Sequence, residues 1–288
     1  MFGLSVRDDR GWHPAPGPPG QSTTTPALCS HKGGFYAAYP DPETGLLHWS
    51  STPGEGQWHE PRPLHEDAVT TCRPALVSNG GTLWCLYTKQ QSGTVFAYPV
   101  HRAHRRQPLA LPYQCTDTGP SAATVTGRRI RVAVRRGPQS VVVGEWRLPR
   151  RPGRPWSLRD QGWLTGEEFP GTLQLAQHDG ATWGVHRGED GAISATVWSP
   201  QRFGLQWDMH GVETDHSPAL TSHAGHLWLA YRDRTSGLLL AASSPDGHHW
   251  SAFSPLTSAA VHTAAPALAS HAGQLYAVHL QPRDPTSS

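Results

Sequence analysis

One pattern of apolar and polar positions recurs along the chain. Its clearest copy starts at Pro218 and reads PALTSHAGHLWLAYRDRTSGLLLAASSPDGHHW. Short apolar stretches alternate with Gly, Asp, Ser and His, which is typical of strands joined by tight turns. Each copy therefore predicts four strands: the first over PALxS, the second over LWLAY, the third over GLLLAASS, and the fourth near a Trp.

The pattern occurs six times. The six copies begin at Pro26, Pro74, Pro120, Leu173, Pro218 and Pro266. The distances between these first residues are 48, 46, 53, 45 and 48 residues. Four antiparallel strands repeated every 40 to 50 residues or so are typical of the blades of a β-propeller.

Two positions that recur in all six copies of the repeat support this interpretation. A glycine stands seven residues after the start of each copy: Gly33, Gly81, Gly127, Gly180, Gly225 and Gly273. A large apolar residue stands ten residues after it: Tyr36, Trp84, Ile130, Trp183, Trp228 and Tyr276. A glycine at a fixed place between two apolar stretches predicts a hairpin turn that needs a positive φ.

The two ends of the chain complete each other. The last copy stops near Gln281 after two strands, and the N-terminal GLSVRDDRGWHPA resembles the second half of a copy, GLLLAASSPDGHHWSA. We therefore predict an all-β fold, a six-bladed β-propeller of four-stranded blades. Residues 1–288 would form a single domain, with residues 1–15 pairing with 266–281 to close the ring and leave no free sheet edge.

The composition agrees with an all-β fold and bears on where in the cell the protein is expected. The chain contains 30 Gly and 27 Pro among 288 residues, which disfavours long helices. It has no run of 18 apolar residues, so we expect no membrane span. The N-terminus shows no secretory signal, and the four cysteines show no CxxC spacing. We therefore expect a cytoplasmic protein with reduced thiols, while export by a non-classical route stays open.

Charge is unevenly distributed. Residues 101–160 contain 13 Arg, no Lys and three acidic residues, which gives +10 within a chain whose formal net charge is +2. Such a sector could face an acidic partner, or it could be a solvated edge of the domain. The charge is local and no recognised motif accompanies it, so the sequence does not favour nucleic acid binding.

One turn carries a family resemblance. The stretch SPDGHHW, from Ser244 to Trp250, resembles the Asp-box (BNR repeat) of the bacterial sialidase-like β-propellers, in a form one residue shorter. Asp246 would bond the backbone of the turn, Gly247 would adopt the turn conformation, and the Trp would pack between blades. The catalytic pattern of the sialidases is absent: Arg73-Pro74 lacks the residue that separates Arg from Pro in their motif, and Cys72 takes the corresponding place.

Candidate functional residues follow from the place of each polar side chain in the repeat. In propellers the connections before each first strand and after each second strand share the face used for ligands. Four recurring histidines lie instead in the opposite turn, where we expect them to cap turn carbonyls: His31, His178, His223 and His271.

The predicted ligand face is rich in acids, arginines and histidines. If the protein is an enzyme, the acid–base candidates are Glu168, Asp215 and His216. The ligand-binding candidates are Cys72, Arg73, Asp117, His186, Arg187, Tyr231, Arg232, His262 and His279. Carboxylates that converge with a His could do general acid–base chemistry or hold a divalent ion. The sequence identifies no cofactor, and the metal is unknown.

Three functions remain open at this point. The first is binding of a saccharide or small anionic ligand at the central mouth, because Trp and Tyr offer flat faces while Arg and acids bond hydroxyl groups. The second is an enzyme with a single axial site, of the glycosidase, lyase or cyclase type. The third is a protein-docking scaffold that uses the Arg-rich sector. The framework repeats while the polar loop residues do not, which favours one or a few sites.

Overall fold

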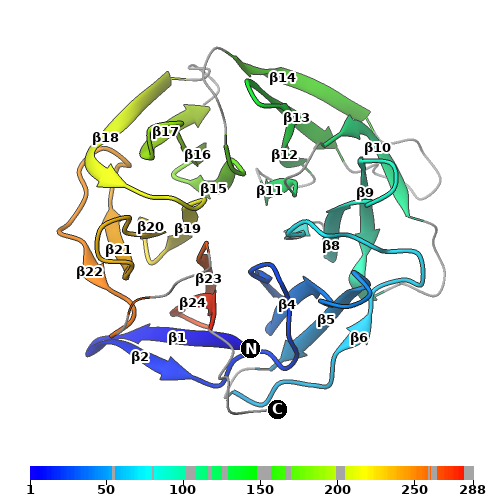
Figure 1. Ribbon diagram of the computed structural model, residues 1–288, viewed down its shortest axis with the longest axis horizontal. Coiled ribbons are helices and arrows are strands. Elements are labelled where there is room, and N and C mark those ends of the chain that lie inside the picture. The colour runs from blue at the N-terminus through cyan, green and yellow to red at the C-terminus, as the bar shows by residue number, and fades with distance from the viewer. Residues whose placement is uncertain are drawn as a thin grey trace.

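The computed structural model is a ring of six four-stranded antiparallel sheets (Figure 1). It describes residues 1–53, 56–79, 81–101, 108–115, 119–124, 129–147, 157–165, 170–198, 205–258, 260 and 265–281. The innermost strand of every sheet contacts the innermost strands of the two neighbouring sheets, so the ring is closed. The predicted all-β, six-bladed propeller is confirmed.

We number the blades in the order of their innermost strands. Blade 1 comprises β3 (Ala27–His31), β4 (Gly34–Pro40), β5 (Leu47–Thr52) and β6 (Arg62–Pro63). Blade 2 comprises β7 (Ala75–Asn79), β8 (Thr82–Thr88), β9 (Thr94–Pro99) and β10 (Leu109–Gln114). Blade 3 comprises β11 (Ser121–Thr124), β12 (Arg129–Gly137), β13 (Ser140–Arg147) and β14 (Ser157–Thr165).

The second half of the ring has the same organisation. Blade 4 comprises β15 (Gln174–His178), β16 (Ala181–Arg187), β17 (Ala192–Trp198) and β18 (Leu205–Glu213). Blade 5 comprises β19 (Ala219–His223), β20 (His226–Arg232), β21 (Leu239–Ser244) and β22 (Ser254–Pro255). Blade 6 comprises β23 (Ala267–His271), β24 (Gln274–Leu280), β1 (Phe2–Asp8) and β2 (Gly11–Ala15).

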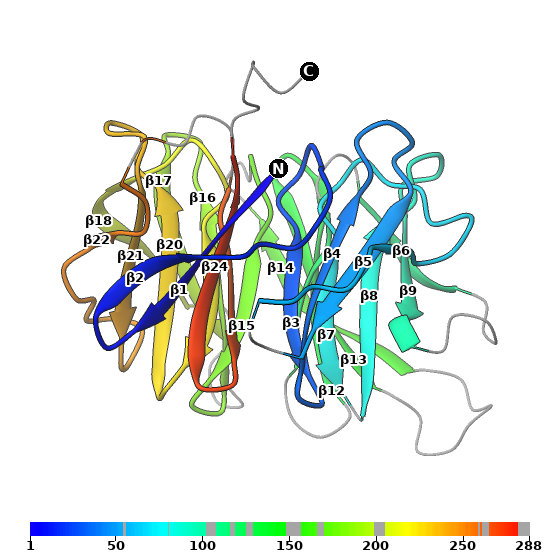
Figure 2. The same ribbon diagram turned by 90° about the horizontal axis from the view of Figure 1, so that it is seen from below.

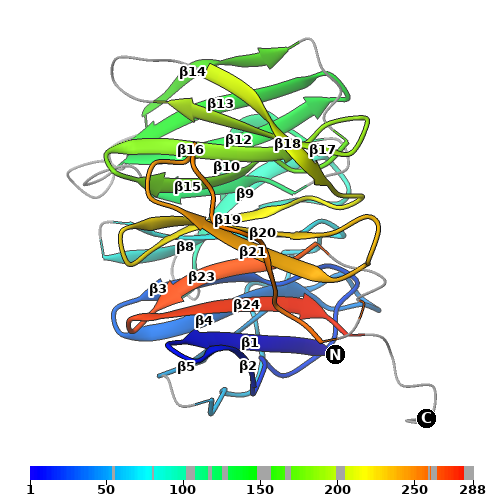
Figure 3. The ribbon, with the colours of Figure 1, turned by 90° about the vertical axis from the view of Figure 1, so that its left-hand side faces the viewer.

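Blade 6 joins the two ends of the chain, as the repeat predicted. Strand β1 pairs with β24 on one side and with β2 on the other; Leu4 lies opposite Val278 and Ala15. The backbone N–H of Gln281 donates to the carbonyl of Met1 at 3.0 Å. Figures 2 and 3 show β1 beside β24, with the N-terminus at the end of the ring where β24 finishes.

The core lies between the blades. Strand residues are apolar on both sides of most sheets, because each blade packs against two neighbours and both of its faces are covered. One such cluster joins blade 6 to blade 1 through Phe2, Leu4, Tyr39, Val278 and Leu280, all buried. Burial of these alternating faces fixes the register of each sheet and therefore the place of every loop.

The turns between the first and second strands have the conformation that the repeat predicted. Their glycines have positive φ: Gly33 (78°), Gly81 (75°), Gly180 (73°), Gly225 (75°) and Gly273 (76°). Gly127 lies outside the described residues. The preceding residue is left-handed too at Lys32 (48°), Asp179 (44°), Ala224 (48°) and Ala272 (47°). Two consecutive positive φ values are the signature of the two-residue turns that match the twist of a hairpin.

The recurring histidines connect neighbouring blades, and the expectation that they mainly cap turn carbonyls was wrong. Each Nδ1 makes a hydrogen bond with a serine hydroxyl on the next innermost strand. The pairs are His31–Ser78 (2.8 Å), His178–Ser222 (3.0 Å), His223–Ser270 (2.9 Å) and His271–Ser30 (3.0 Å). Among the bonds between described residues, His178 alone of the four also bonds a turn carbonyl, that of Pro245. We call these four pairs the His–Ser belt.

The turn from Ser244 to Trp250 is held by its own side chains. Oδ1 of Asp246 accepts the backbone N–H groups of His248 and His249 at 2.9 and 2.8 Å. Gly247 has a φ of 75°, and its carbonyl accepts the indole N–H of Trp250 at 3.1 Å. The predicted roles of Asp246 and Gly247 in this turn are therefore observed.

Candidate functional site

Two sets of connections meet at one end of the ring, which we call the upper face. They are represented by segments 188–191 and 233–238, after second strands, and by segment 214–217, before a first strand. The N-terminus and the end of β24 lie at this end (Figure 2). The opposite end, the lower face, carries the turns at 32–33 and 245–250. Most of the candidate residues belong to the upper face.

Four candidates form a polar cluster between blades 4 and 5, which we call the Asp215 cluster. Nη1 of Arg232 donates to both carboxylate oxygens of Asp215, at 2.8 and 2.6 Å. Nη1 of Arg187 donates to the backbone carbonyl of Asp215 at 2.9 Å. Nε2 of His216 lies 3.8 Å from Oδ1 of Asp215. Arg187 ends β16 and Arg232 ends β20, so equivalent strand ends on two blades hold the loop between them.

The charges of the Asp215 cluster set its protonation. Partial burial alone would raise the pKa of Asp215, but the hydrogen bond from Arg232 and the nearby His216 outweigh it, and the pKa is lowered. Burial lowers the pKa of His216, and the two arginines add to this, while Asp215 opposes it. Near neutral pH the cluster therefore holds an ionised carboxylate beside a neutral imidazole.

This arrangement suits hydrogen bonding better than proton transfer. A general acid needs a pKa raised toward the working pH, whereas the pKa of Asp215 moves the other way. The carboxylate is also engaged by both of its oxygens. Its side chain is still 42% exposed, so the outer lone pairs face solvent.

Two candidates lie near the axis of the ring. Nη1 of Arg73 donates to the carbonyl of Pro266, at the start of β23, at 3.2 Å. This contact spans from blade 2 to blade 6, and burial lowers the pKa of Arg73 to about 10. The backbone N–H of Cys72 donates to Oγ1 of Thr70 at 3.1 Å, as that of His216 does to Oγ1 of Thr214. Cys72 and His216 therefore occupy equivalent places in the repeat.

Two further candidates belong to the core. His186 is fully buried, and burial lowers its pKa to about 4. Tyr231 is 3% exposed and packs edge-on against Phe253, with ring centroids 5.1 Å apart. Neither side chain reaches a surface where a ligand could touch it directly.

His279 lies in a groove of about 430 Å³ on the side of blade 6 that faces blade 5. The groove is lined by Ser5, Trp12 and Pro14 of β1 and β2, by Thr257 and Ser258 after β22, and by His279 and Gln281. The lining combines one indole with several hydroxyl, imidazole and amide groups. We call it the blade 5–6 groove.

Gly3 keeps the upper end of this groove open. A Cβ at Gly3 would lie 2.5 Å from Nε2 of His279 and 3.0 Å from Nε2 of Gln281. Without a side chain at this position, both polar groups can lie over β1. His279 is 7% exposed, and burial lowers its pKa, so at neutral pH its imidazole can donate one hydrogen bond and accept another.

The groove and the Asp215 cluster are adjacent. A Cβ at Gly237 would lie 3.2 Å from the Cβ of Ala260, which lines the groove, and 3.2 Å from Nη2 of Arg232. The backbone at Gly237 therefore lies between the blade 5–6 groove and Arg232 of the Asp215 cluster. Together they form one polar surface on blades 4, 5 and 6.

Three candidates lie outside the described residues: Asp117, Glu168 and His262. Within the described ranges, no three His, Cys, Asp or Glu side chains are arranged as metal ligands. The four cysteines form no disulfide. No helix in the described part of the chain is long and apolar enough to span a membrane.

Part of the Arg-rich sector serves the interior of blade 3. Glu145, on β13, is 4% exposed, and three arginines approach its carboxylate. The nearest N···O distances are 3.0 Å from Arg147, 3.5 Å from Arg129 and 3.8 Å from Arg131. These three arginines compensate a buried charge, which reduces the positive charge left for an acidic partner.

Sequence reasoning missed most of the blade 5–6 groove. The sequence predicts Ser5 and Trp12 only as parts of the N-terminal strands, and nothing in it singles out Thr257. One signal was present: Trp12 precedes the next copy of the repeat by 14 residues, whereas Trp58 and Trp250 precede theirs by 16. Blade 6 thus departs from its neighbours in the outer strand that forms one wall of the groove.

No protein-family model matches this sequence, and no curated protein matches it. Solved structures do resemble the fold. A mutant of AofleA from Arthrobotrys oligospora superimposes with a TM-score of 0.68 at 10% identity, covering 91% of this chain and 82% of that one. The lectin of the fungus Aleuria aurantia, described as a six-bladed propeller with a novel fucose recognition mode, gives 0.61 at 11% identity, covering 80% and 79%.

Sialidases resemble the ring as well. A mutant Trypanosoma rangeli sialidase with trans-sialidase activity gives a TM-score of 0.56 at 10% identity, covering 97% of this chain but only 57% of the sialidase. At these identities the comparisons establish a shared six-bladed architecture. The chemistry has to be argued from the residues of this chain.

Proposed function

We propose that this protein binds a saccharide in the blade 5–6 groove. One observation carries the proposal: the groove of about 430 Å³ joins the indole of Trp12 to hydroxyl, imidazole and amide groups from three separate segments. Ligand sites are concave, with an apolar wall and a few convergent polar groups. Ring closure alone brings these segments together.

The chemistry of the lining fits a sugar. A sugar ring presents an apolar face of C–H groups, which packs on an aromatic wall, and a rim of hydroxyl groups that both donate and accept. His279, as a neutral imidazole, also donates and accepts, as do the hydroxyls of Ser5, Thr257 and Ser258. The fucose recognition described for the Aleuria aurantia lectin supports the same ligand class for this fold.

The neighbouring Asp215 cluster extends the site. A ligand longer than one sugar would pass Gly237 and meet Arg232 and Asp215, whose exposed lone pairs can accept hydroxyl groups. Arg187 adds a cation on the same surface, so an acidic substituent could be accommodated as well. The position at the axial mouth, which the sequence suggested, stays a prediction, as do the roles of Asp117 and His262 in it.

The experiment is a glycan array probed with the purified, labelled protein and two variants. Ser258→Trp places a bulky ring in the groove from an exposed loop position. Glu66→Trp is the matched control, because Glu66 follows Leu64 as Ser258 follows Leu256 and both leucines donate equivalent backbone hydrogen bonds. We expect wild type and Glu66→Trp to bind the same glycans and Ser258→Trp to lose them. Equal binding by all three proteins would exclude the groove.

A further inference from the structure

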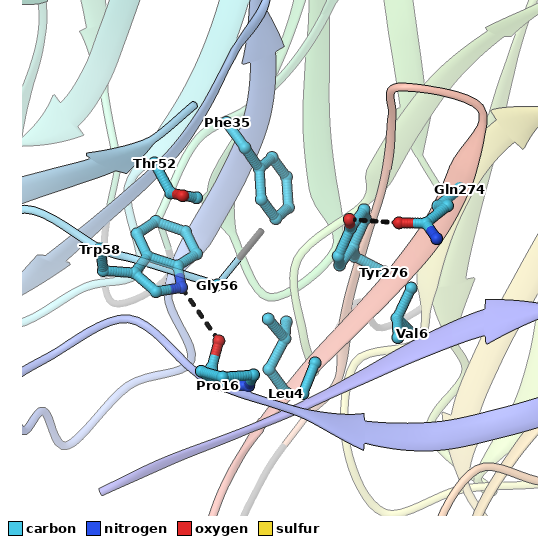
Figure 4. A pocket seen from close by; sticks show the side chains of 10 residues that line it. Leu4, Val6, Pro16, Phe35, Thr52, Gly56, Trp58, Gln274 and Tyr276 are labelled. Carbon is cyan, nitrogen blue, oxygen red and sulfur yellow. Dashed lines mark hydrogen bonds between the residues drawn. The ribbon is translucent and has the colours of Figure 1, made fainter. Parts of the chain in front are cut away.

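The two faces of blade 6 carry different cavities. The face toward blade 1 holds a pocket of about 170 Å³, near the lower face of the ring. Its walls come from Leu4, Val6, Phe35, Trp58, Gln274 and Tyr276 (Figure 4). The alternation of side chains along β1 contributes to this division: Val6 lines the pocket toward blade 1, Ser5 lines the blade 5–6 groove, and Leu4 borders both.

The aromatic rings of this pocket are fixed in place. The indole N–H of Trp58 donates to the carbonyl of Pro16 at 3.0 Å. The hydroxyl of Tyr276 donates to Oε1 of Gln274 at 2.6 Å. Phe35 packs between them, with its centroid 5.6 Å from that of Trp58 and 4.7 Å from that of Tyr276. In Figure 4, Trp58 and Tyr276 stand on opposite sides of the open space.

Equivalent junctions elsewhere in the ring are filled by the protein itself. Tyr276 stands ten residues after the start of its copy. In blades 1, 2, 4 and 5 the ring at this position is covered by a planar group of the next blade, which lies near the end of the third strand or in the segment that follows it. The described pairs are Tyr36–His101 (5.0 Å), Trp84–Trp146 (5.7 Å), Trp183–His248 (5.6 Å) and Trp228–Arg7 (4.7 Å).

At the junction between blades 6 and 1, the planar group that contacts Tyr276 is Phe35, on the second strand of blade 1, and the described residues at the end of the third strand supply none. The third strand of blade 1 ends with Ser51 and Thr52, followed by Pro53, none of which carries a ring or a guanidinium group. Tyr276 is also smaller than the Trp found at this position in blades 2, 4 and 5. The pocket therefore occupies the place where the other junctions hold an imidazole, an indole or a guanidinium.

We infer that this pocket binds a neutral aromatic ring of a small molecule, in the place that a side chain fills elsewhere. Its volume suits a ring of benzene to indole size, since an apolar cavity of about 150 Å³ accommodates benzene. The described residues that line it are all uncharged, which favours a neutral ligand. The amide of Gln274 lies at the exposed edge, where it could bond one polar substituent of the ring.

The test is a titration of 5-fluoroindole followed by fluorine NMR. Tyr276→Trp fills the pocket with the residue that three other blades already carry at this position, so the fold should tolerate it. Tyr36→Trp is the matched control, the same change at the same repeat position in blade 1. We expect saturable binding to wild type and Tyr36→Trp, and binding to Tyr276→Trp that is at least about tenfold weaker.

Two results would overturn the inference. The first is equal 5-fluoroindole affinity in wild type and Tyr276→Trp, or no saturable binding to either. The second is loss of array glycans in Tyr276→Trp, which would make the pocket a sugar site. The proposed function is tested separately, because Ser258 lines the other face of blade 6 and its variant leaves this pocket unchanged.

Discussion

Closure of the ring by the N-terminal strands can be tested by removing them. Deletion of residues 1–15 removes β1 and β2 and leaves β23 and β24 as a two-stranded remnant of blade 6. It exposes the edge of β24, which in the intact protein pairs with β1 from Phe2 to Arg7. Such an open edge pairs readily with other chains.

The energetic loss can be worked out from three side chains. Phe2, Leu4 and Val6 are 4%, 5% and 6% exposed, and Phe2 and Leu4 pack in one cluster with blade 1 and with β24. Burying a side chain of this size contributes about 1.5–3 kcal/mol, so the three together contribute about 5–9 kcal/mol. Domains are commonly stable by about 5–15 kcal/mol, so the deletion removes most of the margin.

The assay is size-exclusion chromatography combined with thermal unfolding followed by circular dichroism. We expect the deletion variant to aggregate or to be unfolded at 25 °C. A peptide of residues 1–15 added in excess should restore part of the folded protein, since it supplies the missing strands. A soluble monomer whose Tm equals that of wild type would refute the closure of blade 6 by these strands.

Three further predictions concern stability. Gly247→Ala should destabilise the protein more than Gly225→Ala. Both glycines have a φ of 75°, so each change costs about 1–3 kcal/mol of backbone strain, but at Gly247 the new Cβ would also lie 2.3 Å from the ring of Trp183. Equal urea unfolding midpoints for the two variants would contradict this. Glu145→Ala should lower the free energy of unfolding by about 3–5 kcal/mol, because it leaves arginines near a buried site without their counter-charge. A loss below about 1 kcal/mol in urea unfolding would show that these arginines are solvated. Stability should fall as the pH drops below about 6.5, because burial lowers the pKa of His31, His223 and His271, and that of His186 to about 4. The unfolded chain then binds protons at a higher pH than the folded protein does, and His186 alone accounts for a loss of roughly 3 kcal/mol between pH 6.5 and 4. A urea unfolding midpoint that does not change over this range would disprove it.

The fold could be predicted because the same pattern of strands and turns recurs in six copies along the chain. A glycine with positive φ at a fixed offset, as at Gly33 and Gly225, marks the same hairpin in successive copies. The left-handed residue before it was not predictable, because Lys32 and Ala224 are not residues that favour this conformation. The His–Ser belt was missed although its signal was present: Ser30 and His31 recur together, but their partners lie one full copy away.

The site was less predictable, because it depends on differences between copies. Asp215 and Arg232 were selected from their loop positions, and the structure brings them into contact. His186 and His279 occupy the same repeat position, yet His186 is fully buried while His279 borders the groove, since Gly3 leaves room beside it. Single-copy features such as Gly3 carry no repeated signal, and the sequence alone therefore could not separate a core histidine from one at a groove.

The most direct test of saccharide binding in the blade 5–6 groove is an isothermal titration with the strongest glycan from the array. Three proteins would be compared: wild type, His279→Ala and Ser258→Trp. We expect a saturable Kd for wild type, at least about tenfold weaker binding for His279→Ala through loss of hydrogen bonds, and no detectable binding for Ser258→Trp. Affinities that agree within twofold across the three folded proteins would contradict the account.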